Sequence, residues 1–222
     1  MRTLALVPAR AGSKGIPHKN TRLFRGAPLL THAVRVGLAT CDQTIVSTDD
    51  PATGLIGAAY GATVLMRPAE LAQDETPMLA VIQHALKHAA GAPDVVVLLQ
   101  PSSPSPRRAE YVREALRLLE ETGADSVVSL VEVPSHYHPL FASEIHSGRV
   151  GPYMIGGWNV HRRQDVGPPA YFRNGTLYVT RRERIERGSL YGHDCRPLII
   201  PPHESVTLDT EDDWLLAEAK HG

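Results

Sequence analysis

The stretch Leu4-Ala5-Leu6-Val7-Pro8-Ala9-Arg10-Ala11-Gly12-Ser13-Lys14-Gly15-Ile16-Pro17-His18-Lys19-Asn20 decides the fold, because a short apolar run leads straight into a basic, glycine-containing loop. The run at 4–7 predicts a buried strand. Two glycines let the backbone turn and bring N–H groups close to a ligand. A loop of this kind is suited to binding phosphate groups. The positive charge that phosphates need would come from Arg10, Lys14 and Lys19.

The alternative is an ordinary surface loop whose cations are solvated. The loop lacks the Gly-x-x-x-x-Gly-Lys-Ser/Thr pattern of P-loop proteins and the Gly-x-Gly-x-x-Gly pattern of dinucleotide-binding folds. It therefore predicts phosphate binding by a different kind of loop.

Strand and helix patterns alternate along the rest of the chain. The run at 94–100 is apolar without alternation, which is typical of a strand in the middle of a parallel sheet. We therefore expect an α/β fold with a mainly parallel, doubly wound (Rossmann-like) sheet. The other expected strands lie at 44–47, 62–66, 126–131, 176–179 and 198–200, and the expected helices lie at 28–40, after Asp50, at 76–90, at 107–122 and after Thr210.

The alternation stops at about 134–170, where proline, glycine and histidine are frequent and only short strand-like pieces occur. We expect a single domain over 1–222 with an inserted arm in this region. His136 and His138 do not predict a metal site, because no third ligand is suitably spaced nearby.

Composition narrows the class of protein. The 222 residues suit one α/β domain, and 42% of them are hydrophobic, enough for a substantial core. A net charge of −1 gives no indication of nucleic acid or of an anionic membrane as partner. No apolar run approaches the roughly 18 residues of a membrane span. The two cysteines, Cys41 and Cys195, are expected to be reduced thiols of a cytoplasmic protein.

The loop at 8–20 resembles the signature of the acylneuraminate cytidylyltransferases (the CMP-sialic acid synthetase family), which couple CTP to a nine-carbon keto-sugar acid. The resemblance covers nearly the whole chain, because further stretches similar to the family follow in order. They are Val46-Ser47-Thr48-Asp49-Asp50, Arg67-Pro68-Ala69-Glu70-Leu71-Ala72, Leu99-Gln100-Pro101-Ser102-Ser103-Pro104, Asn174-Gly175-Thr176-Leu177-Tyr178-Val179, and Leu208-Asp209-Thr210 followed by Glu211-Asp212-Asp213-Trp214.

The resemblance implies a nucleotidyltransferase in which the sugar hydroxyl attacks the α-phosphorus of CTP in line and pyrophosphate leaves. It implies nucleotide binding by Arg10, Lys14, Lys19, Asn20 and Arg67, and catalytic roles for Arg10, Lys19 and Asp209. Asp209 would bind Mg²⁺. It also implies a homodimer with an exchanged arm, and an acceptor site formed by Gln100, Arg163, Gln164, Tyr171 and Asn174.

Several of these residues have simpler interpretations. Arg67 could be a surface residue in a salt bridge, and Gln100 could satisfy the backbone of its loop. Asn174-Gly175 could form a tight turn. Asp49 and Asp50 are interpreted as turn and cap residues, because Pro51 fits the first turn of a helix. Thr210 and Asp213 have the spacing of a capping box.

The chain departs from the family pattern at three places. The usual Asp-x-Asp-Thr is Thr207-Leu208-Asp209-Thr210, so one carboxylate is missing. The arm has Pro139-Leu140-Phe141 where a basic residue is common, and Arg173 stands one place from the usual arginine. These changes predict weaker metal binding or a weaker base function, and as acceptor a different nonulosonic acid or a different acid sugar. The sequence as a whole leaves open a nucleotide-sugar glycosyltransferase or another sugar nucleotidyltransferase of the same fold, and the missing carboxylate at 207 leaves open a nucleotide-binding or regulatory protein with impaired catalysis.

Overall fold

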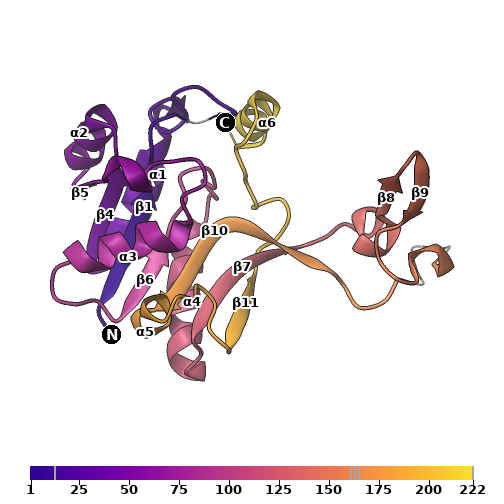
Figure 1. Cartoon of the computed structure of the whole chain (residues 1–222). Helices are drawn as coiled ribbons and strands as arrows, with labels where there is room; N and C mark the ends of the chain where they lie inside the picture. Colours follow the sequence, from indigo (N-terminus) through magenta and orange to yellow (C-terminus); the bar gives the residue numbers. More distant parts are fainter. Residues whose placement is uncertain (13, 161, 163, 165, 222) are drawn as a thin grey trace.

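A seven-stranded sheet forms the centre of the computed structural model, which describes residues 1–12, 14–160, 162, 164 and 166–221. The strand order is β11-β7-β10-β6-β1-β4-β5 (Figure 1). The expected α/β fold with a mainly parallel sheet is confirmed. The strands are β1 (Thr3–Pro8), β4 (Gln43–Thr48), β5 (Thr63–Met66), β6 (Val95–Leu98), β7 (Ser126–Glu132), β10 (Tyr171–Arg181) and β11 (Cys195–Ile199).

Strand β10 is the antiparallel member of this sheet. It pairs with β6 on one side and β7 on the other, and the remaining pairs are parallel. The carboxyl ends of β1, β4, β5 and β6 therefore meet at one edge, which is where α/β sheets bind ligands. The phosphate loop follows β1 at that edge.

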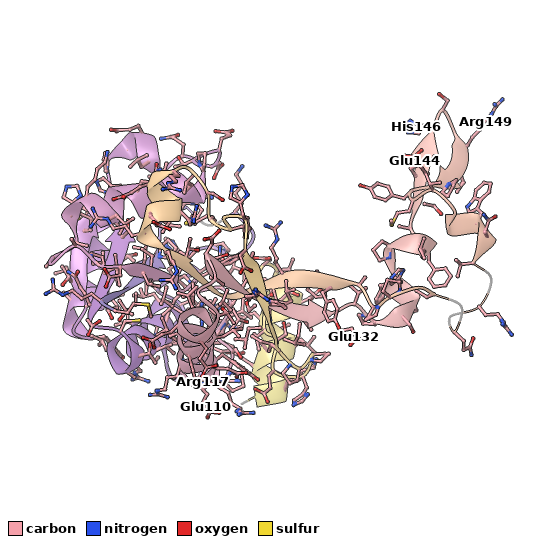
Figure 2. The ribbon with its side chains drawn as sticks, turned by 90° about the horizontal axis from the view of Figure 1, so that it is seen from below. Glu110, Arg117, Glu132, Glu144, His146 and Arg149 are labelled. Carbon is pink, nitrogen blue, oxygen red and sulfur yellow. The ribbon has the colours of Figure 1, made fainter. Side chains whose placement is uncertain are left out.

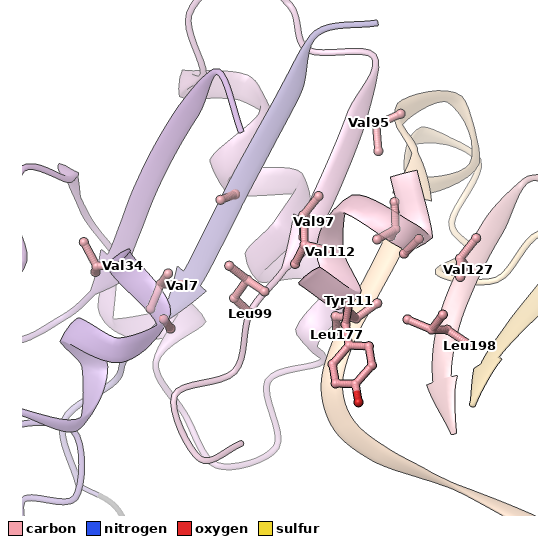
Figure 3. Close-up of a cluster of buried hydrophobic side chains, with 14 of the residues drawn as sticks. Val7, Val34, Val95, Val97, Leu99, Tyr111, Val112, Val127, Leu177 and Leu198 are labelled. Carbon is pink, nitrogen blue, oxygen red and sulfur yellow. The ribbon is translucent and has the colours of Figure 1, made fainter. Parts of the chain in front are cut away.

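Helices cover both faces of the sheet because side chains of β1 alternate between them. Ala5 and Val7 belong to a cluster with residues of α1 and α4, shown in Figure 3, whereas Leu4 and Leu6 pack with residues of α3 and α5. All four side chains are fully buried, so β1 has no solvated face. The helices are α1 (Leu29–Thr40), α2 (Pro51–Ala59), α3 (Met78–His88), α4 (Arg108–Thr122), α5 (Arg182–Glu186) and α6 (Glu211–His221).

A third apolar cluster ties the end of the chain to its beginning. Ile16 of the phosphate loop is buried against Leu208 and against Trp214 of α6. An ion pair of 2.7 Å between Arg22 Nη1 and Glu211 Oε1 joins the same two parts on the surface. Phe24, in the short hairpin of β2 (Leu23–Phe24) and β3 (Ala27–Pro28), also belongs to this cluster.

Residues between β7 and β10 form an arm that extends away from the sheet (Figures 1 and 2). Glu132 lies near its base, and Glu144, His146 and Arg149 lie toward its far end (Figure 2). The described elements of the arm are the hairpin β8 (Ser143–His146) and β9 (Arg149–Pro152), and the 3-10 helices η2 (Ser135–Tyr137), η3 (Pro139–Phe141) and η4 (Gly157–Asn159).

Asp50 caps α2 by accepting hydrogen bonds from the backbone of Ala52 and Thr53, so its interpretation as a cap is confirmed. The possible tight turn at Asn174-Gly175 is wrong: both residues lie inside β10, where the pairing with β7 shifts and Gly175 has a φ of +72°. A glycine with positive φ in a strand is typical of such an irregularity.

None of the helices in the described residues is long and apolar enough to cross a membrane. Cys41 and Cys195 are both free.

Candidate active site

The predicted phosphate loop is held in shape by bonds from its own backbone. Ala9 N–H donates to the Ser47 carbonyl at 2.9 Å, and Ala11 N–H donates to Asp49 Oδ1 at 2.8 Å. Asn20 is nearly buried, and its Nδ2 donates to the Arg10 carbonyl at 3.0 Å. Asn20 therefore fixes the backbone of the loop, and Asp49 supports it from the neighbouring strand β4.

This loop borders an open cleft of about 380 Å³ at the carboxyl edge of the sheet. The cleft gathers all five residues predicted to bind nucleotide, together with Gln100 and the predicted metal ligand Asp209. Five residues of the wall were not predicted as part of the site: Pro8, Gly15, Met78, Pro101 and Ser102 complete the lining.

Lys19 lies between the loop and the carboxyl-terminal part of the chain. Its Nζ donates to the Leu208 carbonyl at 2.8 Å and lies 3.3 Å from Asp209 Oδ1. An ammonium group has three N–H donors, so one remains for a ligand in the cleft. Residues 190 positions apart in the chain thus share one site.

Asp209 sits beside this lysine with a largely exposed side chain, 67% accessible. Its backbone N–H donates to Asp213 Oδ2, which also accepts from Thr210 N–H at 2.8 Å. The reciprocal bond from Asp213 N–H to Thr210 Oγ1 completes the predicted capping box, which is confirmed. The cap holds the Asp209 backbone and leaves its carboxylate available.

Gly15 brings the loop against this same residue. A β-carbon at position 15 would collide with the backbone carbonyl of Asp209. Glycine is therefore required by the close approach of two backbones, and the spacing between the loop and Asp209 depends on it.

Arg67 follows β5 and is buried, with 7% of its surface exposed. The guanidinium donates to Ser47 through Nε and Nη2 and to the Leu71 carbonyl through Nη1, at 2.8–3.3 Å. Burial away from water lowers the pKa of Arg67 from its usual value. The interpretation of Arg67 as a surface residue is therefore wrong. An arginine buried at a cleft with bonds only to uncharged oxygens, among the partners that the structure describes, is well placed to accept an anion.

Asp74 is a further residue of the site that the sequence did not predict. Its carboxylate pairs with Arg10 Nη1 at 2.5 Å and with Lys14 Nζ at 2.6 Å. The hydrogen bond from Lys14, followed by that from Arg10, holds the pKa of Asp74 below its usual value. No sequence signal indicated it, because Asp74 lies in the connection after Arg67, in an unremarkable polar stretch.

The predicted acceptor residues are placed differently from the nucleotide residues. Gln100 lies two residues after the end of β6 and lines the cleft. Asn174 is buried: its Oδ1 accepts from Ser129 Oγ at 2.7 Å, and its Nδ2 donates to Ser205 Oγ at 3.0 Å. Gln164 and Tyr171 are exposed on and next to the arm and do not line the cleft. Arg163 lies outside the described residues.

The residues present suit a magnesium ion shared with a substrate. Mg²⁺ prefers oxygen ligands and is commonly held by one or two carboxylates together with substrate phosphates. Asp209 supplies one exposed carboxylate at the cleft. No cluster of three or more His, Cys, Asp or Glu side chains suited to a metal ion occurs among the described residues. Thr207 is directed elsewhere, with its hydroxyl 3.4 Å from the Asn174 carbonyl.

A basic loop after the first strand, facing a carboxylate across the edge of a mainly parallel sheet, defines an enzyme of the nucleotidyltransferase class. Residues 4–141 match the family model described as cytidylyltransferase, and the chain belongs to this family. The family resemblance and the enzyme class predicted from the sequence are therefore confirmed.

Named relatives extend over almost the whole chain. It is 35% identical over 228 residues to the CMP-N,N'-diacetyllegionaminic acid synthase of Legionella pneumophila, covering 98% of this chain and 95% of that protein. It is 31% identical to N-acylneuraminate cytidylyltransferase A of Danio rerio and 29% identical to an N-acylneuraminate cytidylyltransferase of Streptococcus agalactiae serotype V. These matches cover 97% of this chain but span 50% and 52% of those longer proteins.

A solved structure supports the fold. The structure of CMP:2-keto-3-deoxy-manno-octonic acid synthetase complexed with CTP superimposes with a TM-score of 0.75, covering 99% of this chain and 98% of that chain at 15% identity. At this identity the similarity shows the fold alone.

Proposed function

We propose that this protein is a cytidylyltransferase that couples CTP to a nonulosonic, sialic-acid-like keto-sugar acid and releases pyrophosphate. The observation that carries the proposal is the single cleft in which Arg10, Lys14, Lys19 and Arg67 face Asp209. The relatives named above include synthases of CMP-linked acid sugars, which favours an acid sugar as acceptor and CTP as donor.

The chain's own residues perform in-line transfer mainly by alignment and charge. Arg10, Lys14 and Lys19 hold the triphosphate and offset the charge that develops on its oxygens in the transition state. Asn20 keeps the loop carbonyl of Arg10 in place, so the cations are positioned before the substrate arrives. Gln100 contacts the acceptor from the loop that follows β6.

We propose Mg²⁺ as the cofactor, held by Asp209. The ion supplies Lewis-acid stabilisation of phosphate charge when bound. Lys19 lies beside the same carboxylate and keeps it oriented toward the cleft. The missing carboxylate at Thr207 makes Asp209 the protein's principal contribution to the ion.

The proposed reaction is tested by a pyrophosphate-release assay with CTP and a panel of nonulosonic acids. We expect release that requires CTP, a divalent cation and the sugar acid together, and that stops when EDTA is added in excess. Equal rates with GTP or ATP, or release without any sugar acid, would contradict the proposal. Binding of CTP with no release for any acid of the panel would favour the nucleotide-binding protein with impaired catalysis.

We further propose that the arm completes the site of a second copy of the chain, so that the protein acts as a homodimer. The arm extends away from its own cleft, and it exposes large apolar side chains that a monomer would leave in water (Figure 2). These side chains are Ile145, Val150, Tyr153, Ile155 and Trp158. Among the described residues, none of the arm lines the cleft of its own chain, which has the same explanation. A cytoplasmic location is consistent with the two free cysteines.

Mixed dimers test the exchange of arms. Lys19→Ala removes a cleft residue and Arg163→Ala removes an arm residue, so each variant alone is expected to be nearly inactive. Coexpression of the two chains should restore roughly a quarter of the wild-type turnover, because half of the dimers are mixed and each mixed dimer has one intact site. Activity of the coexpressed pair no higher than that of the separate variants, in dimers shown to be mixed, would contradict the exchange.

A further inference from the structure

Asp74 occupies the donors that a phosphate group would use. Each of its carboxylate oxygens takes one cation, Arg10 at 2.5 Å and Lys14 at 2.6 Å. Carboxylate and phosphate oxygens bind the same guanidinium and ammonium donors, so the two anions compete. Two of the cleft's four cations are therefore paired with one carboxylate of the protein itself, which offsets one of their two positive charges.

The remaining two cations have different partners. Lys19 lies beside Asp209, and Arg67 donates to the Leu71 carbonyl at 3.3 Å. Leu71 is the last residue of η1 (Ala69–Leu71), and Asp74 lies in the connection 72–77, which runs from there to the start of α3. The connection is thus held against the cleft wall at two points. Arg67 holds it at Leu71, and Arg10 and Lys14 hold it at Asp74.

Both points of attachment use residues that line the cleft, Arg67 at one and Arg10 with Lys14 at the other. Met78, the first residue of α3, follows the connection directly and also lines the cleft. Asp74 itself does not line the cleft, so the space for a ligand is open while its cations are engaged. The Lys14 side chain is 76% exposed, which leaves it free to exchange one anion for another.

We propose that Asp74 is an internal counter-anion of the phosphate site, which holds Arg10 and Lys14 in the empty enzyme and is displaced when an oligophosphate binds. The connection 72–77 acts as a latch: every ligand that needs both cations must first release Asp74. The inference rests on the proposed function for the identity of the natural ligand, CTP, but its physical content concerns any oligophosphate.

If Asp74 acts as a latch, removing its charge should raise the affinity for some ligands and not for others. A ligand that displaces Asp74 binds less tightly by a constant factor, whatever its other contacts are. A ligand that reaches the cleft without touching Arg10 and Lys14, such as cytidine, is not affected. Removing the charge of Asp74 should therefore tighten the binding of pyrophosphate and of CTP by the same factor and leave cytidine unchanged.

The test is titration calorimetry of the wild type and of Asp74→Asn with inorganic pyrophosphate, CTP and cytidine at one Mg²⁺ concentration. We expect dissociation constants for pyrophosphate and CTP about three- to tenfold lower in the variant, the range for two partly exposed ion pairs. Glu75→Gln is the matched control. Glu75 is the next residue along the chain, its side chain is exposed, and it forms no ion pair with the described residues. Removal of its charge should therefore leave all three dissociation constants unchanged.

Each outcome of the titrations supports or overturns the proposed role of Asp74. Weaker or unchanged pyrophosphate binding in Asp74→Asn overturns the latch and makes Asp74 a residue that only positions the cations. Pyrophosphate binding by neither protein overturns it as well, since the cations would then not form a phosphate site. Tighter pyrophosphate binding in the variant without CTP binding by either protein supports the latch while rejecting CTP as the substrate.

Discussion

Lys19→Ala is expected to lower turnover by about 10²–10³-fold while leaving the fold intact, the usual cost of losing one preorganised group that stabilises transition-state charge. The reason is its place in the structure: the ammonium joins the Leu208 carbonyl and Asp209 and retains one donor for phosphate. The loss should fall mainly on kcat, because charge on the phosphoryl oxygens develops in the transition state. Steady-state kinetics with CTP measures it.

Lys87→Ala is the control for the change in charge. Lys87 is an exposed lysine in the last turn of α3, away from the cleft, and its removal should leave turnover unchanged. Thermal unfolding of both variants should resemble that of the wild type. Near-full turnover of Lys19→Ala would refute the role given to this residue and with it the assignment of the cleft.

Gly15→Ala is expected to lower turnover by about 10²-fold through geometry alone, because a displacement of about 1 Å at a catalytic group can cost that much. The added methyl group would meet the backbone carbonyl of Asp209, which cannot turn aside as a flexible side chain could. The loop and Asp209 must therefore move apart. The apparent Mg²⁺ requirement should rise together with the loss of turnover, and a magnesium titration of activity measures both.

Gly123→Ala separates stability from geometry. Gly123 follows α4 with a φ of +69° and has open space around it. Alanine there should lower the free energy of unfolding by about 1 kcal/mol and leave turnover per folded molecule unchanged. Gly15→Ala with normal turnover would show that the approach of loop and Asp209 is not needed for catalysis.

The cleft itself could be foreseen only in part. Arg10, Lys14 and Lys19 stand in one continuous stretch, so the sequence alone places them together. Arg67 and Gln100 follow strands, and parallel strands end at a common edge, so their convergence follows from the predicted fold. Asp74 could not be foreseen, because it reaches the cations through the path of a connection that no periodic pattern describes.

The acceptor residues show where local patterns fail. The local sequence of Asn174 predicts a turn or a substrate contact, but the irregularity in β10 buries its side chain against Ser129 and Ser205. A carboxamide buried in this way satisfies hydrogen bonds that the shifted strand pairing leaves open. Strand pairing depends on residues that are far away in the chain, so the sequence near Asn174 does not predict where the pairing of β10 becomes irregular.

The sequence by itself determined the alternation of the main strands and helices along the chain, the position of the basic loop and the position of the arm. The reason is that hydrophobic periodicity, glycine and charge act over a few neighbouring residues. Tertiary structure alone decided that Asp209 lies beside Lys19, that two backbones touch at Gly15, and that Asp74 pairs with both Arg10 and Lys14. The first two contacts depend on the apolar cluster of Ile16, Leu208 and Trp214, which joins the ends of the chain through burial of surfaces that are distant in sequence.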